Sequence, residues 1–240
     1  SDRRPWDTNF RTDTIILATV NTKKGTVNLT SFPRDLYVRI PGWGMNRINT
    51  AYYRGGYELL ADTLETNFGV RPDHYVLIDF SSFKRTVDGL GGLEVDVKQP
   101  LTDYRNGYGY VTISEGEVYM DADLVLWYVR SRKTSNDFQR GRRQQEVLQA
   151  LMEKFLTMDV IRRAPEFYEI YKDSVTTDLT FSDLVPLMPM ATLLTDSSRL
   201  NHYYIGPKEV YNWISPEGAM VLMPQPAEIQ AVLEKSLNMQ

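Results

Sequence analysis

Short apolar runs separated by a polar turn open the chain. Residues 14–20 are apolar and rich in β-branched side chains, and the polar segment 21–25 separates them from a similar run at 26–32. The two runs are therefore expected to pair as a β-hairpin. Residues 36–40 alternate between apolar and polar positions, which predicts a third strand that ends at the glycine-containing turn 41–44.

Helical spacing of apolar residues recurs along the rest of the chain. The expected helices cover residues 48–68, 80–90, 121–132, 140–158, 160–172, 181–194 and 226–237. The expected strands cover residues 74–79, predicted to be buried, and residues 93–97, 202–205 and 219–223. Residues 99–116 are rich in Gly, Tyr, Asn and Asp and are expected to form the longest loop. The alternation predicts an α/β fold, a single three-layer α/β/α domain over residues 1–240 with a central mixed β-sheet.

Length and composition agree with such a domain. With 240 residues, of which 42% are hydrophobic, the chain is long enough to bury a sizeable core. The absence of cysteine excludes disulfides and thiolate chemistry. His74 and His202 lie in apolar or aromatic runs and are expected to be packing residues, so a Ser-His-Asp triad is poorly supported. No run approaches the ~18 apolar residues of a membrane span, so the chain is expected to be a soluble piece with any membrane anchor outside it.

Arginine is frequent for an acidic protein. The net charge of −4 argues against a protein that binds nucleic acid electrostatically. The chain nevertheless has 18 arginines against 9 lysines, and the planar guanidinium group suits bidentate recognition of phosphate. The arginines gather in clusters at 2–4, 11–13, 33–35 and 130–144. This clustering predicts a binding site for a phosphorylated ligand.

The last of these clusters has the densest positive charge. Its fourteen residues from 130 to 143 contain one acid, Asp137, and six cations: Arg130, Arg132, Lys133, Arg140, Arg142 and Arg143. Residues two apart on a regular helix point in different directions. For Arg130 and Arg132 to reach one ligand, the helix is therefore expected to unwind near Ser131.

Helical periodicity separates the later arginines from one another. The apolar stripe of the helix at 140–158 consists of Val147, Leu148, Leu151 and Phe155. Arg140 and Gln144 project from this stripe and are expected to lean toward the core, whereas Arg142 is expected to face water. The amide groups at a helix N-terminus attract anions, which favours a phosphate beside Arg140.

Two aspartates are candidates for holding a cation. Asp2 and Asp13 flank a loop that ends where the first expected strand begins, so both carboxylates are expected at one edge of the sheet. Magnesium typically uses one or two carboxylates together with substrate phosphates and water. The chain has no complete dinucleotide-binding glycine motif and no P-loop, which disfavours a nucleotide-dependent enzyme.

Short motifs occur in a fixed order between residues 1 and 158. They are Ser1-Asp-Arg-Arg4, Arg11-Thr-Asp-Thr14, Ser31-Phe-Pro-Arg-Asp35, Arg47-Ile-Asn-Thr-Ala-Tyr52 with Gly55-Gly56, Tyr75 to Phe80, Asp88 to Gly92, Tyr128-Val-Arg-Ser-Arg132 and Asp137 to Gln145. Together they resemble the motifs of the LytR-CpsA-Psr (LCP) phosphotransferases of bacterial cell-envelope assembly. Arg47 stands where that family more usually has lysine, and the family strand that precedes Asp2 is missing. Residues 159–240 carry no such motif and are expected to complete the core.

The resemblance implies a function and a site. It implies transfer of a glycopolymer, such as a teichoic acid, from an undecaprenyl or decaprenyl diphosphate carrier onto peptidoglycan, with the charge of the diphosphate stabilised by Mg²⁺ and arginines. The implied metal ligands are Asp2 and Asp13. The implied catalytic residues are Arg34, Arg130, Arg132, Asp137 and Arg140. The implied substrate-binding residues are Arg3, Arg11, Arg47 and Gln144.

The resemblance also implies a place in the cell, and two other functions stay open. The chain would lie on the extracellular face of the bacterial cytoplasmic membrane, held by an N-terminal anchor outside the sequence. A polyprenyl diphosphate hydrolase or a non-catalytic lipid-phosphate binding protein would need the same arginines. A transcriptional regulator is disfavoured, because the charge is acidic and no helix-turn-helix is recognisable.

Overall fold

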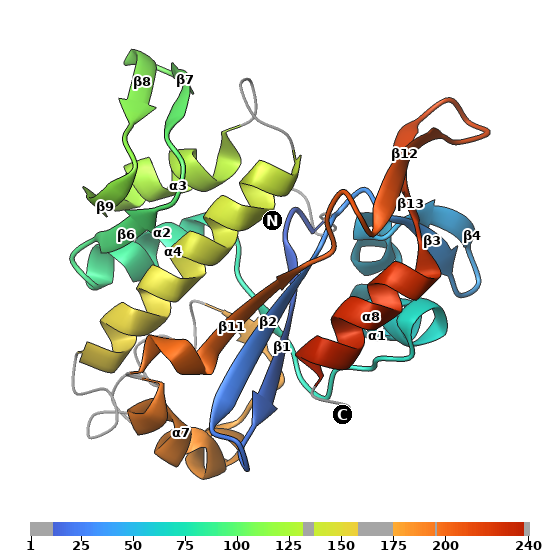
Figure 1. Ribbon diagram of the computed structural model, residues 1–240, viewed down its shortest axis with the longest axis horizontal. Coiled ribbons are helices and arrows are strands. Elements are labelled where there is room, and N and C mark those ends of the chain that lie inside the picture. The colour runs from blue at the N-terminus through green and yellow to red at the C-terminus, as the bar shows by residue number, and fades with distance from the viewer. Residues whose placement is uncertain (1–11, 132–136, 158–174, 195, 238–240) are drawn as a thin grey trace. The chain divides into compact units, whose positions relative to one another are not determined.

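The computed structural model describes residues 12–131, 137–157, 175–194 and 196–237 (Figure 1). Its contacts divide the chain into two compact units. Unit 1 combines residues 1–75 with residues 197–240, and unit 2 is the continuous segment 76–196. Each unit has its own sheets and helices, and the expectation of a single domain stays a prediction.

Unit 1 contains the mixed sheet that the apolar runs predict. Strands β1 (Ile15–Asn21) and β2 (Thr26–Phe32) pair antiparallel over their full length, as expected for a hairpin. Strand β11 (Leu200–Tyr204) pairs parallel with β2, so the three-stranded sheet is mixed. Helix α8 (Pro226–Ser236) packs against β2 and β11.

A second group of strands in unit 1 lies beside helix α1. Strands β3 (Tyr37–Ile40) and β4 (Gly44–Arg47) form a hairpin. Strands β12 (Val210–Ile214) and β13 (Met220–Pro224) form another, of which the sequence indicated only β13. A parallel bridge between Leu36 and Leu222 joins the two hairpins.

Helix α1 (Asn49–Phe68) is interrupted at its glycine pair. Gly55 and Gly56 both leave helical geometry, and Gly56 has a φ of 65°, which an L side chain rarely adopts. Beyond the break, Leu64 and Phe68 are buried, as the helical spacing predicts. The following segment differs from the expectation: His74 is exposed, so its assignment as a packing residue is wrong.

Unit 2 is built around two antiparallel strand pairs. Strand β6 (Leu93–Val97) pairs with β9 (Gly116–Met120), and β7 (Leu101–Arg105) forms a hairpin with β8 (Gly109–Ile113). The predicted loop at 99–116 is therefore wrong. Its glycines confine the turn to the tip, where Gly107 and Gly109 have positive φ, while the flanking residues keep the alternating burial of strands.

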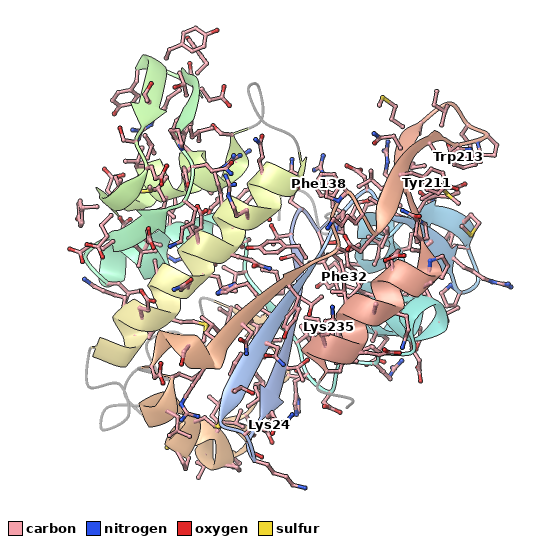
Figure 2. The ribbon with its side chains drawn as sticks, in the orientation of Figure 1. Lys24, Phe32, Phe138, Tyr211, Trp213 and Lys235 are labelled. Atoms are coloured by element: carbon pink, nitrogen blue, oxygen red, sulfur yellow. The ribbon has the colours of Figure 1, made fainter. Side chains whose placement is uncertain are left out.

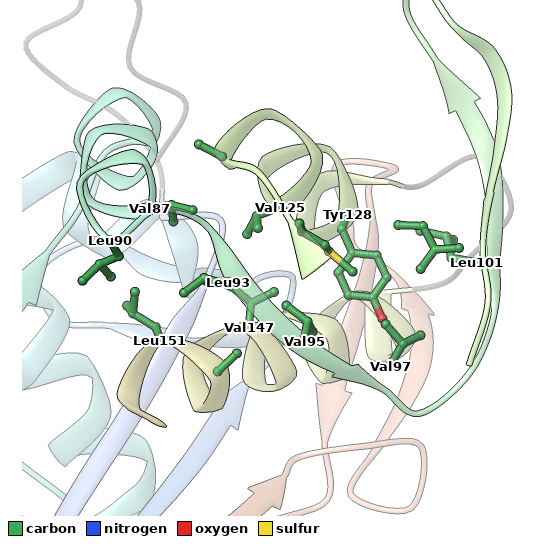
Figure 3. Close-up of a cluster of buried hydrophobic side chains, with 14 residues drawn as sticks. Val87, Leu90, Leu93, Val95, Val97, Leu101, Val125, Tyr128, Val147 and Leu151 are labelled. Atoms are coloured by element: carbon green, nitrogen blue, oxygen red, sulfur yellow. The ribbon is translucent and has the colours of Figure 1, made fainter. Parts of the chain in front are cut away.

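Three helices cover the β6–β9 pair and close the core of unit 2. They are α2 (Phe80–Gly89), α3 (Ala122–Arg130) and α4 (Asp137–Thr157). Figure 3 shows side chains of α2, α3 and α4 gathered along β6, with the buried Tyr128 near Val95 and Val97. Asp79 and Asp121 cap the first two helices by accepting hydrogen bonds from the amides of Ser82 and Leu124.

The rest of unit 2 consists of short elements. The predicted buried strand at 74–79 is reduced to β5 (Val76–Leu77), which pairs with β10 (Thr176–Thr177) and leaves Val76 exposed. The predicted helix at 181–194 is divided into α6 (Phe181–Leu184), η2 (Val185–Leu187) and α7 (Met188–Leu193), and a further turn, η3 (Ser197–Arg199), leads back into unit 1. The helix expected at 160–172 lies outside the described residues. Among the described helices, none is both long and apolar enough to cross a membrane.

Candidate functional site

A row of alternating charges lies on unit 1, where β2 leads into β3. The Asp13 carboxylate accepts a hydrogen bond from Nη1 of Arg34 at 2.5 Å. Nε of Arg34 lies 3.4 Å from one oxygen of Asp35, and Nε of Arg47 lies 3.2 Å from the other. All four side chains are partly exposed. The structure thus brings three predicted site residues, Asp13, Arg34 and Arg47, into one network.

Backbone bonds hold this network in place. The amide of Ile48 donates to the carbonyl of Leu36, and the amide of Asn49 donates to the carbonyl of Arg34. Arg34 and the start of α1 are therefore tied together through the main chain. Two buried oxygens accompany the network: within the described residues, Oγ1 of Thr12 and Oδ1 of Asn49 have no hydrogen-bond partner. Such oxygens are suited to a polar ligand or to ordered water.

The end of α3 has the unwound geometry that the sequence predicts. The helix ends at Arg130, and Ser131 leaves it with φ −55° and ψ 133°. The exposed guanidinium of Arg130 lies 4.5 Å above the ring of Phe80. Unwinding at Ser131 is therefore confirmed. Arg132 lies outside the described residues, so joint binding by the two arginines stays a prediction.

Arg143 of α4 clamps this unwound turn. Its Nε donates to the carbonyl of Tyr128 at 2.9 Å, and one terminal nitrogen donates to the carbonyl of Ser131 at 2.6 Å. The carbonyls at the end of a helix lack partners within the helix, so a buried guanidinium satisfies them. Arg143 is almost fully buried, at 2% exposure. It holds the backbone that presents Arg130.

A buried acid balances the charges beside the clamp. Glu146 accepts a hydrogen bond from the Tyr128 hydroxyl at 2.7 Å and lies 3.1 Å from Nε of Arg142. Burial, followed by this hydrogen bond, raises the pKa of Tyr128. Burial also lowers the pKa of Arg143, and the nearby charges of Arg142 and Arg140 lower it further. Positive charge is therefore concentrated at this end of α4, which suits an anionic ligand.

The helical phase predicted for α4 is only partly right. Arg140 is buried at 6% exposure, as expected, but Gln144 is only half-buried. Arg142 does not face water: its side chain is 23% exposed and pairs with Glu146. The buried face is turned toward Arg143 because α4 packs against both β6 and α3. Tertiary contacts therefore decide which of the consecutive arginines is buried.

The remaining predicted site residues are not placed. Asp2, Arg3, Arg11 and Arg132 lie outside the described residues, and of Asp137 only its position as the first residue of α4 is described. The two groups of placed residues belong to different units. Arg34, Arg47 and Asp13 are in unit 1; Arg130, Arg140 and Gln144 are in unit 2.

Sequence reasoning missed Arg143, Glu146 and Tyr128. One signal was present: in the motif Asp-x-x-Arg-x-x-Arg-Gln, the second arginine falls on Arg143. The burial of Tyr128 is set by the core cluster around it. No local pattern in the sequence shows this burial.

Magnesium prefers oxygen ligands, and the predicted ligands, Asp2 and Asp13, offer carboxylate oxygens. No group of three or more His, Cys, Asp or Glu residues that could hold a metal is found in the part of the chain that the structure describes. The predicted pair contributes one described carboxylate, Asp13, and the hydroxyl of the neighbouring Thr12 is a buried oxygen without a hydrogen-bond partner there. This set fits an ion that takes few protein ligands and completes its shell with phosphate and water.

The fold and site define an α/β protein with clustered, partly buried arginines suited to a phosphorylated ligand. The chain belongs to the LytR_cpsA_psr family, which matches residues 1–232. A polyisoprenyl-teichoic acid–peptidoglycan teichoic acid transferase, TagT of Bacillus subtilis (strain 168), is 32% identical over 206 residues, covering 84% of this chain and 64% of that relative. The chain thus spans slightly less than two thirds of TagT.

Solved structures of the family confirm the α/β fold class. B. subtilis TagV has a TM-score of 0.79 at 26% identity, covering 95% of this chain and 90% of that chain. TagT bound to LI-WTA has a TM-score of 0.74 at 26% identity, covering 95% of this chain and 85% of that chain. The resemblance drawn from the short motifs is therefore confirmed as family membership.

Proposed function

We propose that the chain transfers a glycopolymer from a polyprenyl diphosphate carrier to peptidoglycan. The observation that carries the proposal is the turn after α3, where Arg143 clamps the backbone and Arg130, Arg140 and Arg142 add positive charge. Membership of a family that includes teichoic acid transferases supports a glycopolymer of the teichoic acid class. The proposed place of action is the extracellular face of the bacterial cytoplasmic membrane.

The proposed reaction is a phosphoryl transfer. A hydroxyl oxygen of peptidoglycan attacks the phosphorus that carries the polymer, and a new P–O bond forms to that oxygen. The P–O–P bond breaks, polyprenyl monophosphate leaves with the bonding electron pair, and the hydroxyl proton passes to a base. Positioning and charge stabilisation supply most of the rate in such reactions.

The residues of this chain have separate proposed roles. Arg130, Arg132 and Arg140 are proposed to bind the diphosphate and stabilise its charge. Arg34 is also proposed to stabilise phosphate charge, and Arg3, Arg11 and Arg47 are proposed to bind the substrate. Asp137 and Gln144 orient the arginines. Arg143 is a positioning residue, because it contacts the backbone at Tyr128 and Ser131.

Magnesium fits the proposal as a bound cofactor. Asp2 and Asp13 would hold it, and it would neutralise charge on the diphosphate oxygens. In unit 1, Arg34 shares the carboxylate of Asp13. Arg34 thereby keeps the Asp13 carboxylate oriented whether or not the ion is bound.

An acceptor assay tests the proposal. The purified chain is incubated with a short-chain polyprenyl diphosphate that carries an oligosaccharide, with Mg²⁺, and with or without peptidoglycan oligosaccharides. Mass spectrometry should detect the phosphodiester-linked product and stoichiometric polyprenyl monophosphate. Cleavage with no product in the presence of acceptor would instead establish a hydrolase, and saturable binding without cleavage would establish a lipid-phosphate binding protein.

A further inference from the structure

An exposed apolar surface lies on the two hairpins of unit 1, β3–β4 and β12–β13. Six large side chains form it, here called the hairpin surface: Trp43, Met45, Tyr211, Trp213, Ile214 and Met220. Met220 and Ile214 are the most exposed, at 70% and 64%. Figure 2 shows Tyr211 and Trp213 on the β12–β13 hairpin. Large apolar side chains exposed together on neighbouring hairpins mark an interaction site.

Direct contacts connect the two hairpins across this surface. Met45 lies opposite Arg39, and the neighbouring same-face pair is Tyr37 opposite Arg47. The ring of Trp213 covers Tyr37 at a centroid distance of 5.5 Å. Arg47 donates to the carbonyl of Met220 at 2.8 Å. The β3–β4 hairpin thus contacts Trp213 through Tyr37 and the backbone of Met220 through Arg47.

Ile214 is the cross-strand partner of Met220, and these two side chains lie on the opposite face of the β12–β13 hairpin from Tyr211 and Trp213. The opposite face of β3 carries Val38 and Ile40, which are buried in the core. The hairpin surface is therefore the outer face of the β3–β4 strands together with both faces of the end of the second hairpin.

Cations accompany the apolar side chains. Exposed Arg39 lies opposite Met45, and the guanidinium of exposed Arg54 lies 4.2 Å from the centre of the Trp43 ring. Neither Arg39 nor Arg54 has an ion-pair partner among the residues that the structure describes. One acid, Glu217, lies in the β12–β13 turn and acts on Tyr37. The surface therefore combines apolar side chains with net positive charge.

We propose that the hairpin surface docks on the interfacial region of an anionic phospholipid bilayer. Trp and Tyr favour the headgroup level, Ile and Met favour the acyl boundary beneath it, and arginines keep their charge at the anionic surface. The inference rests on the proposed function, because a donor with a polyprenyl chain stays in the membrane. Docking would bring the chain to that donor without any contact to the diphosphate.

Other occupants fit this surface less well. Saccharides stack on flat open ring faces, whereas one face of Trp43 carries Arg54 and Trp213 is tilted by 51° against Tyr37. The side chains with the greatest exposure are Ile214 and Met220, which have no ring. A second copy of the chain would bring a second set of the same arginines, with Glu217 as the nearby acid. Like charges would therefore repel each other across such a contact.

Vesicle sedimentation tests the docking directly. The purified chain is mixed with vesicles of phosphatidylcholine alone or with 30% phosphatidylglycerol, without any diphosphate donor. We expect binding to the anionic vesicles and a drop of about tenfold or more in the partition coefficient for Ile214→Ser/Met220→Ser. Arg39→Gln/Arg54→Gln should lose a similar factor, and high salt should weaken the unaltered chain in the same way.

A matched control comes from the exposed β7–β8 hairpin of unit 2. Tyr108 and Tyr110 are 69% and 74% exposed, so Tyr108→Ser/Tyr110→Ser removes comparable apolar surface elsewhere. This variant should bind vesicles like the unaltered chain. Equal loss in the control, retained binding by Ile214→Ser/Met220→Ser, or no binding by the unaltered chain would overturn the proposal.

Two further measurements keep the test independent of folding and of catalysis. Brominated acyl chains should quench the tryptophan emission of the unaltered chain on anionic vesicles, and absence of quenching counts against docking. Turnover of a water-soluble short-chain donor should be unchanged in Ile214→Ser/Met220→Ser. If that donor is not turned over by any form, the proposed function fails while vesicle binding still decides the docking. A dimer, or a complex with peptidoglycan fragments, that this variant abolishes would assign the surface to that partner instead.

Discussion

Replacing the clamp residue Arg143 should cost more stability than replacing its neighbour Arg142. In Arg143→Met, the carbonyls of Tyr128 and Ser131 each lose a charged donor, at 2.9 and 2.6 Å. Net hydrogen bonds to charged groups contribute about 1.5–3 kcal/mol each, and the two share one side chain. The expected loss in the free energy of unfolding is therefore about 3–5 kcal/mol. Arg143→Lys should lose about half of this, because an ammonium group cannot span both carbonyls in fork geometry.

Thermal and urea unfolding measure this difference. A loss of about 3–5 kcal/mol should lower the Tm by roughly 6–20 °C in a chain of this size. Arg142→Met is the control. Its side chain is 23% exposed, and Glu146 keeps the hydrogen bond from Tyr128, so about 1 kcal/mol is expected.

The positioning role predicts a second effect. At a temperature where each variant is fully folded, Arg143→Lys should still bind a short-chain polyprenyl diphosphate more weakly, because the turn that presents Arg130 is less fixed. Equal stability losses at Arg143 and Arg142, or undiminished ligand affinity in folded Arg143→Lys, would refute the reasoning.

Three further predictions concern the site and its surroundings. Arg140→Ala should lower kcat/KM roughly 30-fold or more at both low and high salt, which corresponds to a loss of about 2 kcal/mol or more in transition-state stabilisation. A smaller, salt-sensitive loss would indicate only a solvated basic face. Asp13→Asn should abolish magnesium-dependent turnover with the fold retained, and full activity at limiting Mg²⁺ would contradict the metal assignment. Burial lowers the pKa of His202, because the folded chain favours the neutral imidazole. The contribution of His202 to the free energy of unfolding is therefore fully present above its ordinary pKa near 6.5, and it is lost as the pH falls through the lower pKa of the folded state. His202→Asn should flatten this acid dependence in urea unfolding, and an unchanged pH profile would show that other groups cause it.

Local pattern was sufficient for most elements of this fold. The paired runs of β1 and β2 were recognisable because each is apolar, β-branched and bounded by a polar turn. The β7–β8 hairpin was missed because its composition is that of a loop. Its strands are stabilised by cross-strand pairs such as Thr102 with Thr112 and Tyr104 with Tyr110, which join residues that composition treats separately.

The candidate site was predictable in its chemistry and only partly in its geometry. Clustered arginines indicated phosphate, and the bond between Arg34 and Asp13 shows two motifs of the sequence meeting in space. The helix at α4 was evident, but its buried face was misjudged. Burial of Arg143 depends on carbonyls in the last turn of α3 and just after it, fifteen and twelve residues earlier in the chain. The periodicity of apolar residues within α4 carries no information about those carbonyls.

The division of the chain has a consequence for the order in which the protein assembles. Strand β11 pairs with β2 only after the whole of unit 2 has intervened in the sequence, and the side chain of Asn28 donates to the carbonyl of Ser236, 208 residues away. During synthesis, the edge of β2 that later pairs with β11 therefore stays unpaired while unit 2 emerges as a continuous segment with its own core. Contacts of such long sequence separation slow folding, and an open strand edge favours aggregation. Unit 2 should consequently fold first, and the nascent chain should be most vulnerable to misassembly until β11 and α8 leave the ribosome.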